Sequence, residues 1–419
     1  MPTVNWEVRK QSPHYRLYSL ERFFLAKKIR CLRYMLFIQL LNQNSAGSTD
    51  NSEFINILAI SMMIMSFQND LFRLRPSNFY PSEGFYPSGS FDPFWSRDEE
   101  GLEMFLMRFR FRLPHFHRLM TAMGLDGKYF TCEQGNKYRA DLCMMVLLRR
   151  LAYPCTFKQL VAEFGIPSHR LCEIFHVAVE FVFDRYHALI EFETWTPFFE
   201  QFAEIFVEYG SPFPSLVGLL DGNFLRFCRP RGLGNKRSRL DQGQFYTGEK
   251  CAHGVKHLAA FFPNGMTALA GPFLGTVGDG RMTGESGWLN MLRRRSLIDN
   301  IRYKLFGDAA FGVSNFIQSM LKGEAAIRPE GRAFNALMSR IRVNIENAFG
   351  HQSNLFTFLA FHRSLKLGGR NVLKIYKVAC ILMNMRCTFY GNQFTHQLGH
   401  ALHMEIEDLL SLCPTPGAN

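Results

Sequence analysis

The stretch Ser215-Leu-Val-Gly-Leu-Leu220-Asp221-Gly222 is a short apolar run that ends in an aspartate and a glycine. Its length and its bounding residues predict a buried strand rather than a helix. A second short run, Tyr303–Phe306, ends in Gly307-Asp308. We therefore expect two buried strands of one sheet, each carrying a carboxylate at its end.

Two longer extended runs and an amphipathic helix belong to the same part of the chain. The runs 253–262 and 266–274 are joined by Pro263-Asn264-Gly265, and Asn-Gly between apolar runs predicts a hairpin. Further along, apolar residues recur at helical spacing, which predicts a helix with one buried face formed by Phe334, Met338, Ile341, Ile345 and Phe349. Strands with helices after and between them indicate a mixed α/β domain over residues 214–390.

Residues 99–213 have helical periodicity and predict an all-α region. Within it, a short helix starting at Thr156, a turn at Ile166-Pro-Ser168 and a second helix starting near His169 have the layout of a helix-turn-helix. If this unit reads DNA, the residues facing the major groove are His169, Arg170 and Glu173. We favour an ordinary helical hairpin in a bundle, because arginines do not cluster on the second helix.

Three further segments frame these two regions. Residues 1–75 form a helical segment of unknown role, 76–98 form a linker rich in Pro, Gly, Ser and aromatic residues, and 391–419 form a C-terminal tail. The most apolar run, near 55–67, is too short to span a bilayer, which needs roughly twenty residues. In the tail, His396, His400 and His403 have a spacing that suits zinc, although a solvated helix is the simpler interpretation.

Charge and cysteine usage narrow the class of partner and compartment. The net charge is +12 with a pI near 9.3, and such a surplus favours a polyanionic partner. The ten cysteines include no C-x-x-C pair, which argues against a zinc finger and a disulfide framework and fits reduced thiols in the cytosol or nucleus. The first thirty residues contain no secretory apolar core, so we expect no secretory signal there.

Basic residues gather after Asp221, in a segment broken by Gly232 and Gly234. A flexible basic loop beside an acidic site can clamp phosphates, and such contacts position DNA without reading its sequence. Lys250 and His257 extend this predicted positive surface, and a solvated loop is the alternative. The predicted DNA-binding residues are Arg226, Arg229, Arg231, Lys236, Arg237, Arg239 and Lys256.

Glu346 lies on the predicted amphipathic helix, next to its buried face, so it can join Asp221 and Asp308. Three hard oxygen ligands suit Mg²⁺ or Mn²⁺. Two such ions about 4 Å apart activate a water and stabilise a leaving oxygen in phosphodiester hydrolysis. Simpler interpretations remain open: Asp221-Gly222 as a turn, Asp308 as a helix N-cap, and Glu346 as a surface ion pair with Arg342.

Several of these stretches resemble motifs of the PIF/Harbinger transposases and their domesticated nuclease relatives. Leu219-Leu-Asp221-Gly-Asn-Phe224 is similar to the first-Asp motif, and Phe306-Gly-Asp308-Ala-Ala-Phe311 to the second. Arg342-Val-Asn-Ile-Glu346-Asn-Ala-Phe-Gly350 resembles the Glu-Asn-Ala-Phe-Gly signature, the most specific of the set. The resemblance covers roughly residues 100–390 and also includes the basic strand Tyr246–Lys256.

The resemblance implies an RNase H-like mixed-sheet catalytic domain preceded by the helix-turn-helix-like region, with a catalytic triad of Asp221, Asp308 and Glu346. It also implies a divalent metal, Mg²⁺ or Mn²⁺, held by these three acids. Family members carry a further Asp before Ser between the two main aspartates. The corresponding place here is Gly284-Glu285-Ser286, so Glu285 is the fourth predicted metal ligand and Asp279 a weaker stand-in.

The function implied is a nuclear DDE-type endonuclease or transposase that hydrolyses phosphodiester bonds at transposon-type DNA ends. A Myb-like accessory protein is the expected partner, no membrane is involved, and homo-oligomerisation is left open. The alternative is a domesticated, catalytically silent DNA-binding or adapter protein that keeps the fold. A glycosidase with two carboxylates is less favoured, because the basic segment after Asp221 suits phosphate and not a neutral sugar.

Overall fold

The computed structural model describes residues 32, 63, 99–132, 135–230, 243–362, 365, 372–392, 395–396 and 404–414. The chain divides into two compact units, one of residues 1–96 with 157–171 and one of residues 97–156 with 172–419. Apart from two residues, the predicted segments 1–75 and 76–98 lie outside the described part of the chain. No helix within the described ranges is long and apolar enough to cross a membrane.

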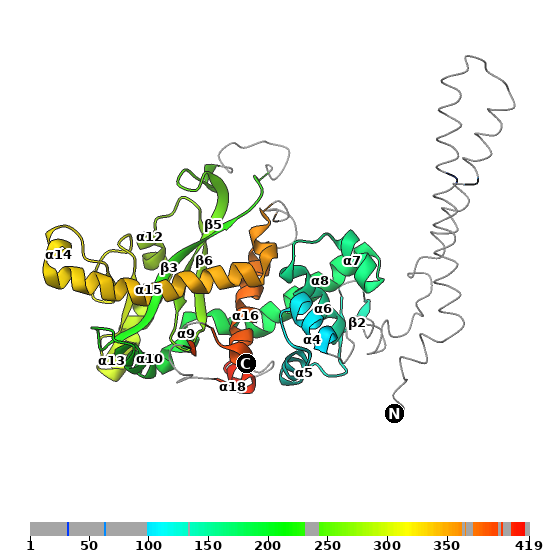
Figure 1. Cartoon of the computed structure of the whole chain (residues 1–419), viewed down its shortest axis with the longest axis horizontal. Helices are drawn as coiled ribbons and strands as arrows, with labels where there is room; N and C mark the ends of the chain where they lie inside the picture. Colours follow the sequence, from blue (N-terminus) through cyan, green and yellow to red (C-terminus); the bar gives the residue numbers. More distant parts are fainter. Residues whose placement is uncertain are drawn as a thin grey trace, which may run out of the picture. The chain divides into compact units, whose positions relative to one another are not determined.

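A mixed β-sheet forms the centre of the larger unit (Figure 1). Three strands are antiparallel neighbours: β6 (Thr267–Leu274), β5 (Ala252–Phe261) and β3 (Leu216–Arg226). On the other edge of β3, β7 (Lys304–Gly307) and β8 (Ile317–Ser319) continue the sheet in parallel. The short β4 (Tyr246–Thr247) pairs with the start of β5. This arrangement confirms the predicted fold class, a mixed α/β domain of RNase H-like type.

The turn between β5 and β6 is the predicted hairpin. Gly265 adopts a positive φ of 83°, which glycine reaches without steric cost. The Phe262 N–H donates to the Met266 carbonyl at 3.0 Å, and the Met266 N–H donates to Asn264 Oδ1 at 3.1 Å. The Asn-Gly pair thus closes the strands as its turn chemistry requires.

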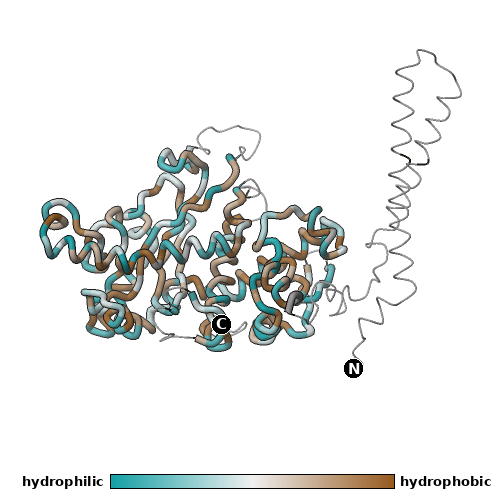
Figure 2. The backbone as a smooth tube through the Cα atoms, in the orientation of Figure 1, coloured by the Kyte–Doolittle hydropathy of each residue, from teal (hydrophilic) through white to brown (hydrophobic). Residues whose placement is uncertain are grey.

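The long helix α15 (Pro329–Leu355) packs on the sheet through one apolar face. In Figure 2 its tube changes repeatedly between hydrophobic and hydrophilic colours, as expected of an amphipathic helix. Its buried residues join those of α10 (Phe199–Glu208) and the strands in one core cluster, made of Phe206, Leu216, Leu219, Phe261, Phe306, Met338, Ile341 and Ile345. This packing confirms the predicted buried face at Met338, Ile341 and Ile345 and holds α15 in a defined register over β3.

A second helix, α16 (Val372–Tyr390), is joined to the sheet by a buried asparagine. Asn384 Nδ2 donates to the carbonyls of Thr267 at 3.0 Å and Leu189 at 2.9 Å, and its Oδ1 accepts from the Thr267 N–H at 3.0 Å. A buried polar group is tolerated only when it is hydrogen-bonded, and here one amide satisfies three backbone groups. The edge strand β6 is therefore held to α16 and to η3 (His187–Ile190).

The region before the sheet is mostly helical, but the all-α prediction is wrong at one place. A two-stranded antiparallel sheet forms between β1 (Tyr129–Thr131) and β2 (Lys137–Arg139). Each strand has only three residues, with Phe130 or Tyr138 buried in the middle, and so is too short for the alternation that marks a strand in sequence. The remaining elements of this unit are α4 (Glu99–Phe109), α5 (Leu113–Ala122), α6 (Ala140–Ala152), α9 (Phe192–Trp195), η4 (Thr196–Phe198), α12 (Asp279–Glu285), α13 (Trp288–Asp299), α14 (Glu324–Ile327), η5 (Thr357–Ala360) and α18 (Ile406–Ser411).

The helix-turn-helix layout is present as predicted, with α7 (Phe157–Phe164), a glycine at φ +67° and α8 (Ser168–Tyr186). His169 is exposed and Arg170 is half-buried. The carboxylate of Glu173, however, accepts a hydrogen bond from Tyr138 Oη at 2.7 Å. This side chain therefore stabilises the small hairpin β1–β2 and is not presented to a partner.

Part of the predicted C-terminal tail is folded onto this unit. In α18, Ile406, Leu409 and Leu410 are buried. The helix is also tied to α5, since Arg118 Nη2 lies 2.7 Å from both Glu405 and Glu407. Of the three tail histidines considered for zinc, only His396 lies among the described residues, where its Nε2 is 3.0 Å from the Tyr390 carbonyl oxygen.

Candidate active site

Asp221 lies in the middle of β3 and not at its end. The apolar run stops at Leu220, but pairing with β5 continues past Asp221, which faces Ala259, to Arg226. The strand-end prediction and the turn alternative are both wrong here, because antiparallel backbone pairing with β5 extends the strand beyond its apolar part. On its other edge, β3 pairs with β7 only as far as Leu219 and Phe306. Asp221 therefore lies where β3 and β7 part.

Asp308 lies directly after β7, on the other side of the same parting point. Its Oδ1 accepts a hydrogen bond from the Ala310 N–H at 2.8 Å, and no helix follows, so it closes a turn and is not the helix N-cap considered as an alternative. Gly307 makes this turn feasible, because a Cβ there would lie 2.6 Å from the Phe311 ring. Since Leu219 pairs with Phe306 in parallel register, Asp221 and Asp308 stand at matching levels of neighbouring chain segments.

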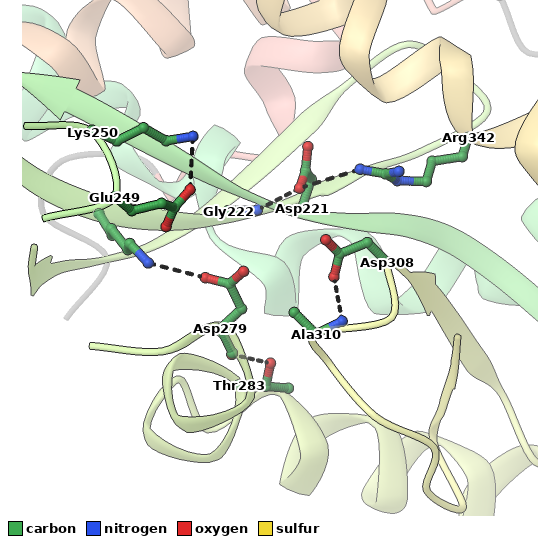
Figure 3. Close-up of polar contacts among 10 residues, drawn as sticks. Asp221, Gly222, Glu249, Lys250, Asp279, Thr283, Asp308, Ala310 and Arg342 are labelled. Atoms are coloured by element: carbon green, nitrogen blue, oxygen red, sulfur yellow. Dashed lines mark hydrogen bonds and ion pairs between the residues drawn. The ribbon is translucent and has the colours of Figure 1, made fainter. Parts of the chain in front are cut away.

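Glu346 comes to the same place from α15. Its neighbour Ile345 is buried in the core cluster, whereas the Glu346 side chain is 54% exposed and stands at the rim of the packed face. One turn earlier, Arg342 Nη2 lies 3.2 Å from Glu346 Oε1 and 4.0 Å from Asp221 Oδ1. The predicted Arg342–Glu346 ion pair is thus present, and the same guanidinium also faces Asp221 (Figure 3).

The three carboxylates share one electrostatic environment. Burial raises the pKa of Asp221 to about 6; the Gly222 N–H and Arg342 oppose the rise, while the negative charges of Asp308 and Glu346 add to it. In Figure 3, Arg342 points sideways toward Asp221, and Asp308 lies just below Asp221. Three acids from β3, the β7 turn and α15 therefore influence one another electrostatically. Gathering like charges is unfavourable without a cation, and a partly desolvated carboxylate is the kind of group that a divalent ion stabilises.

The donor set fits a hard divalent cation, although the side chains do not yet enclose one. As they stand, no three His, Cys, Asp or Glu side chains in the described ranges are grouped closely enough to hold an ion. Arg342 is the cation that faces Asp221 and Glu346. Carboxylate oxygens are the ligands that Mg²⁺ and Mn²⁺ prefer. Binding of such an ion would require the Arg342 guanidinium to move away from the two carboxylates.

A fourth acid lies against β3, and it is Asp279 and not Glu285. A Cβ on Gly222 would meet Asp279 Oδ1 at 3.1 Å, so glycine next to Asp221 leaves room for this carboxylate. Asp279 also pairs with Lys256 of β5 at 3.4 Å. Glu285 lies at the other end of α12, exposed, with its Oε1 2.6 Å from Arg281 Nε. The sequence ranked the two acids in the opposite order, because it could not show which end of α12 packs on β3.

The predicted DNA-binding residues are only partly described. Arg226 and Arg229 are exposed at and beyond the end of β3. Lys256 is 14% exposed and paired with Asp279. Arg231, Lys236, Arg237 and Arg239 lie outside the described residues. His257, expected on the positive surface, is fully buried, and burial lowers its pKa to about 3.

Residues 220–384 match the family described as DDE superfamily endonuclease. The matched stretch contains Asp221, Asp279, Asp308 and Glu346, together with Arg342. It covers less than half of the chain and supports a nuclease kind of enzyme at the level of this superfamily, whose members generally use divalent metals. No curated protein and no solved structure matches the chain.

Sequence reasoning missed the role of Arg342 as a shared partner of Asp221 and Glu346. Its position four residues before Glu346 indicated one ion pair, but the contact to Asp221 arises only because α15 packs across β3. The pairing of Lys256 with Asp279 was missed for the same reason, since the two residues come from β5 and α12.

Proposed function

We propose that this protein is a metal-dependent DNA endonuclease of the DDE type. The observation that carries the proposal is that Asp221 and Asp308 stand at matching levels where the pairing of β3 with β7 ends, with Arg342 between Asp221 and Glu346. All three acids lie within the stretch that matches the DDE superfamily endonucleases. Within the superfamily we assign the chain to the PIF/Harbinger branch on the Glu346–Gly350 signature. Transposon-type DNA ends, a Myb-like accessory protein, homo-oligomerisation and a nuclear location are proposed on that assignment alone.

The metal ligands in this proposal are Asp221, Asp308 and Glu346. Of the two candidates for a fourth position, Asp279 is favoured over Glu285, because Asp279 lies against Gly222. When bound, Mg²⁺ or Mn²⁺ would activate a water and stabilise the leaving oxygen of the phosphodiester.

The residues of the chain itself have separate tasks. The turn at Ala310 fixes the orientation of Asp308, and the packing of Ile345 fixes that of Glu346. Arg342, once released from the carboxylates, is placed to pair with a phosphate oxygen, which a guanidinium binds well. Exposed Arg226 and Arg229 would contact the backbone farther along β3.

Nicking of a supercoiled plasmid with Mg²⁺ or Mn²⁺ tests this function. The sharpest variant is Asp308→Asn, because the amide oxygen can still accept the Ala310 N–H and the turn is kept. We expect the nicking rate to fall by a factor on the order of 10³. Glu324→Gln, a neutralised exposed acid on α14, is the control that should nick like the natural chain. Equal nicking by Asp308→Asn would refute the proposal.

A catalytically silent, DNA-binding protein is the second candidate, and Arg342 is the observation that favours it. A guanidinium already pairs with Glu346 and faces Asp221, so it offsets part of their negative charge without a metal ion. Calorimetry separates the two candidates. Heat of Mn²⁺ binding that disappears in Asp221→Asn supports the nuclease, whereas no heat at millimolar Mn²⁺ supports the silent protein.

A further inference from the structure

A strip of cations and aromatic rings lies on the helical side of the larger unit, apart from the carboxylates. It is contributed by α6, α15 and α16 and by the residues that follow α4 and α6. We call it the basic strip, and it consists of Arg110, Arg112, Arg149, Tyr153, His351, Arg386 and Tyr390.

The basic strip is built from stacked guanidinium and phenol groups. At one end, the guanidinium carbons of Arg110 and Arg149 lie 4.6 Å and 5.4 Å from the ring centre of the exposed Tyr153. At the other end, the guanidinium carbon of Arg386 lies 4.1 Å from the ring centre of Tyr390. Arg386 Nε donates to the Arg110 carbonyl at 2.9 Å, which joins the two ends.

The positive charge of Arg110 and Arg386 is not balanced by acids in the described part of the chain. Arg110 donates to the carbonyls of Leu355 and Ala152, and Arg386 Nη1 lies 3.5 Å from His351 Nε2. Neither arginine pairs with a carboxylate among the described residues. Burial, followed by the charge of Arg386, lowers the pKa of His351. Cations held together by stacking, without acidic partners, favour an external anion.

The strip is also continuous with the helix that carries Glu346. His351 lies on α15 five residues after Glu346, which corresponds to a rise of about 8 Å along the helix. Five residues also turn the helix by about 140°, so the carboxylate site and the strip lie on different faces of α15 and would contact separate parts of an extended polyanion. Guanidinium groups suit its phosphates, and the exposed Tyr153 ring offers a stacking face for a base.

We propose that the basic strip is a second DNA-binding surface, which holds the phosphodiester backbone away from the bond that is cut. This proposal depends on the proposed function only because the nuclease function is the reason for choosing DNA as the polyanion. Binding can be measured without metal, so the two proposals can fail separately.

The test is binding of a fluorescent DNA duplex to the full chain in EDTA, followed by anisotropy between about 50 and 200 mM salt. In Arg112→Gln/Arg386→Gln we expect the slope of log affinity against log salt to become shallower by about two, with a loss of affinity of roughly tenfold. Arg112→Lys/Arg386→Lys, which keeps both charges, should restore the slope.

The matched control is Arg294→Gln/Arg302→Gln, which removes two exposed charges elsewhere. Arg302 precedes β7, at the end opposite Asp308, and Arg294 is 76% exposed on α13. We expect this variant to bind DNA with the natural slope. Tyr153→Ala, which leaves all charges, should weaken single-stranded DNA more than duplex.

Three results would overturn the proposal: an unchanged slope in Arg112→Gln/Arg386→Gln, an equal loss in the control, or stronger strip-dependent binding of RNA or an acidic peptide than of DNA. Failure of the nuclease looks different. In that case the natural chain binds DNA but does not nick it with Mn²⁺. Arg112→Gln/Arg386→Gln still shows the shallower salt slope.

Discussion

Arg342 of α15 faces Asp221 of β3, with its Nη2 4.0 Å from the carboxylate Oδ1. The two residues are 121 positions apart in the chain and meet because Ile341 and Ile345 pack α15 on the sheet. The same nitrogen is 3.2 Å from Glu346. A guanidinium thus lies where a divalent ion would have to approach these two acids.

Arg342→Gln should therefore strengthen Mn²⁺ binding. A single charge about 4 Å from a carboxylate is worth up to about 4 kcal/mol near a protein surface, and partial exposure of Arg342 and Glu346 reduces this to about 1 kcal/mol. We expect the dissociation constant to fall roughly fivefold by calorimetry. Arg340→Gln, an exposed charge on the same helix, is the control and should leave it unchanged. Weaker binding in Arg342→Gln would show that the guanidinium supports the metal site.

Substitutions of Asp279 and Glu285 should give different results in the same assays. Asp279→Asn should lower Mn²⁺ affinity and the nicking rate by about 10- to 100-fold, because it removes a carboxylate that lies against Gly222 and pairs with Lys256. Glu285→Gln should change neither by more than about twofold, since it breaks only an exposed ion pair with Arg281. Loss of activity in Glu285→Gln alone would restore the fourth ligand predicted from sequence.

Because His257 is buried, we expect the stability of the fold to fall in acid. Its ring packs on Tyr376 with centroids 4.5 Å apart, and neither of its buried nitrogens has a hydrogen-bond partner among the described residues. Burial, with a smaller contribution from Lys377, lowers the pKa of His257 from 6.5 to about 3. Between pH 6.5 and 3, His257 is therefore protonated in the unfolded chain and neutral in the folded chain. Its contribution to the free energy of unfolding is complete above pH 6.5 and is lost as the pH falls toward 3.

The free energy of unfolding should then decline by up to about 1.4 kcal/mol per pH unit below pH 6 through His257 alone. His257→Phe keeps an aromatic ring beside Tyr376 and removes the titration. We expect a smaller decline in this variant when denaturant unfolding is measured at pH 7, 6 and 5. His253→Phe on the same strand, where the ring is half-buried, serves as the control. Equal declines in the natural chain and His257→Phe would exclude His257 as the cause.

Local sequence patterns were sufficient for the elements whose signal is local. The Asn264-Gly265 turn, the buried face of α15 and the short run that became β7 were all predicted, because turn chemistry and periodicity act over a few residues. The extent of β3 and the hairpin β1–β2 were not predicted. Both depend on pairing with other strands. Such pairing can extend a strand beyond its apolar run, and it can stabilise a strand that is only three residues long.

By itself, the sequence determined which residue types are present at which spacing: two aspartates after short apolar runs, a glutamate beside a buried helical face, and an excess of cations. Only the tertiary structure decided which of these groups meet. Packing of α15 and α12 on β3 brings Arg342 to Asp221 and Asp279 to Gly222, and it buries His257. The reason is physical: periodicity determines the face of an element on which a side chain lies, whereas the register between packed elements depends on how their side chains fit together in the core.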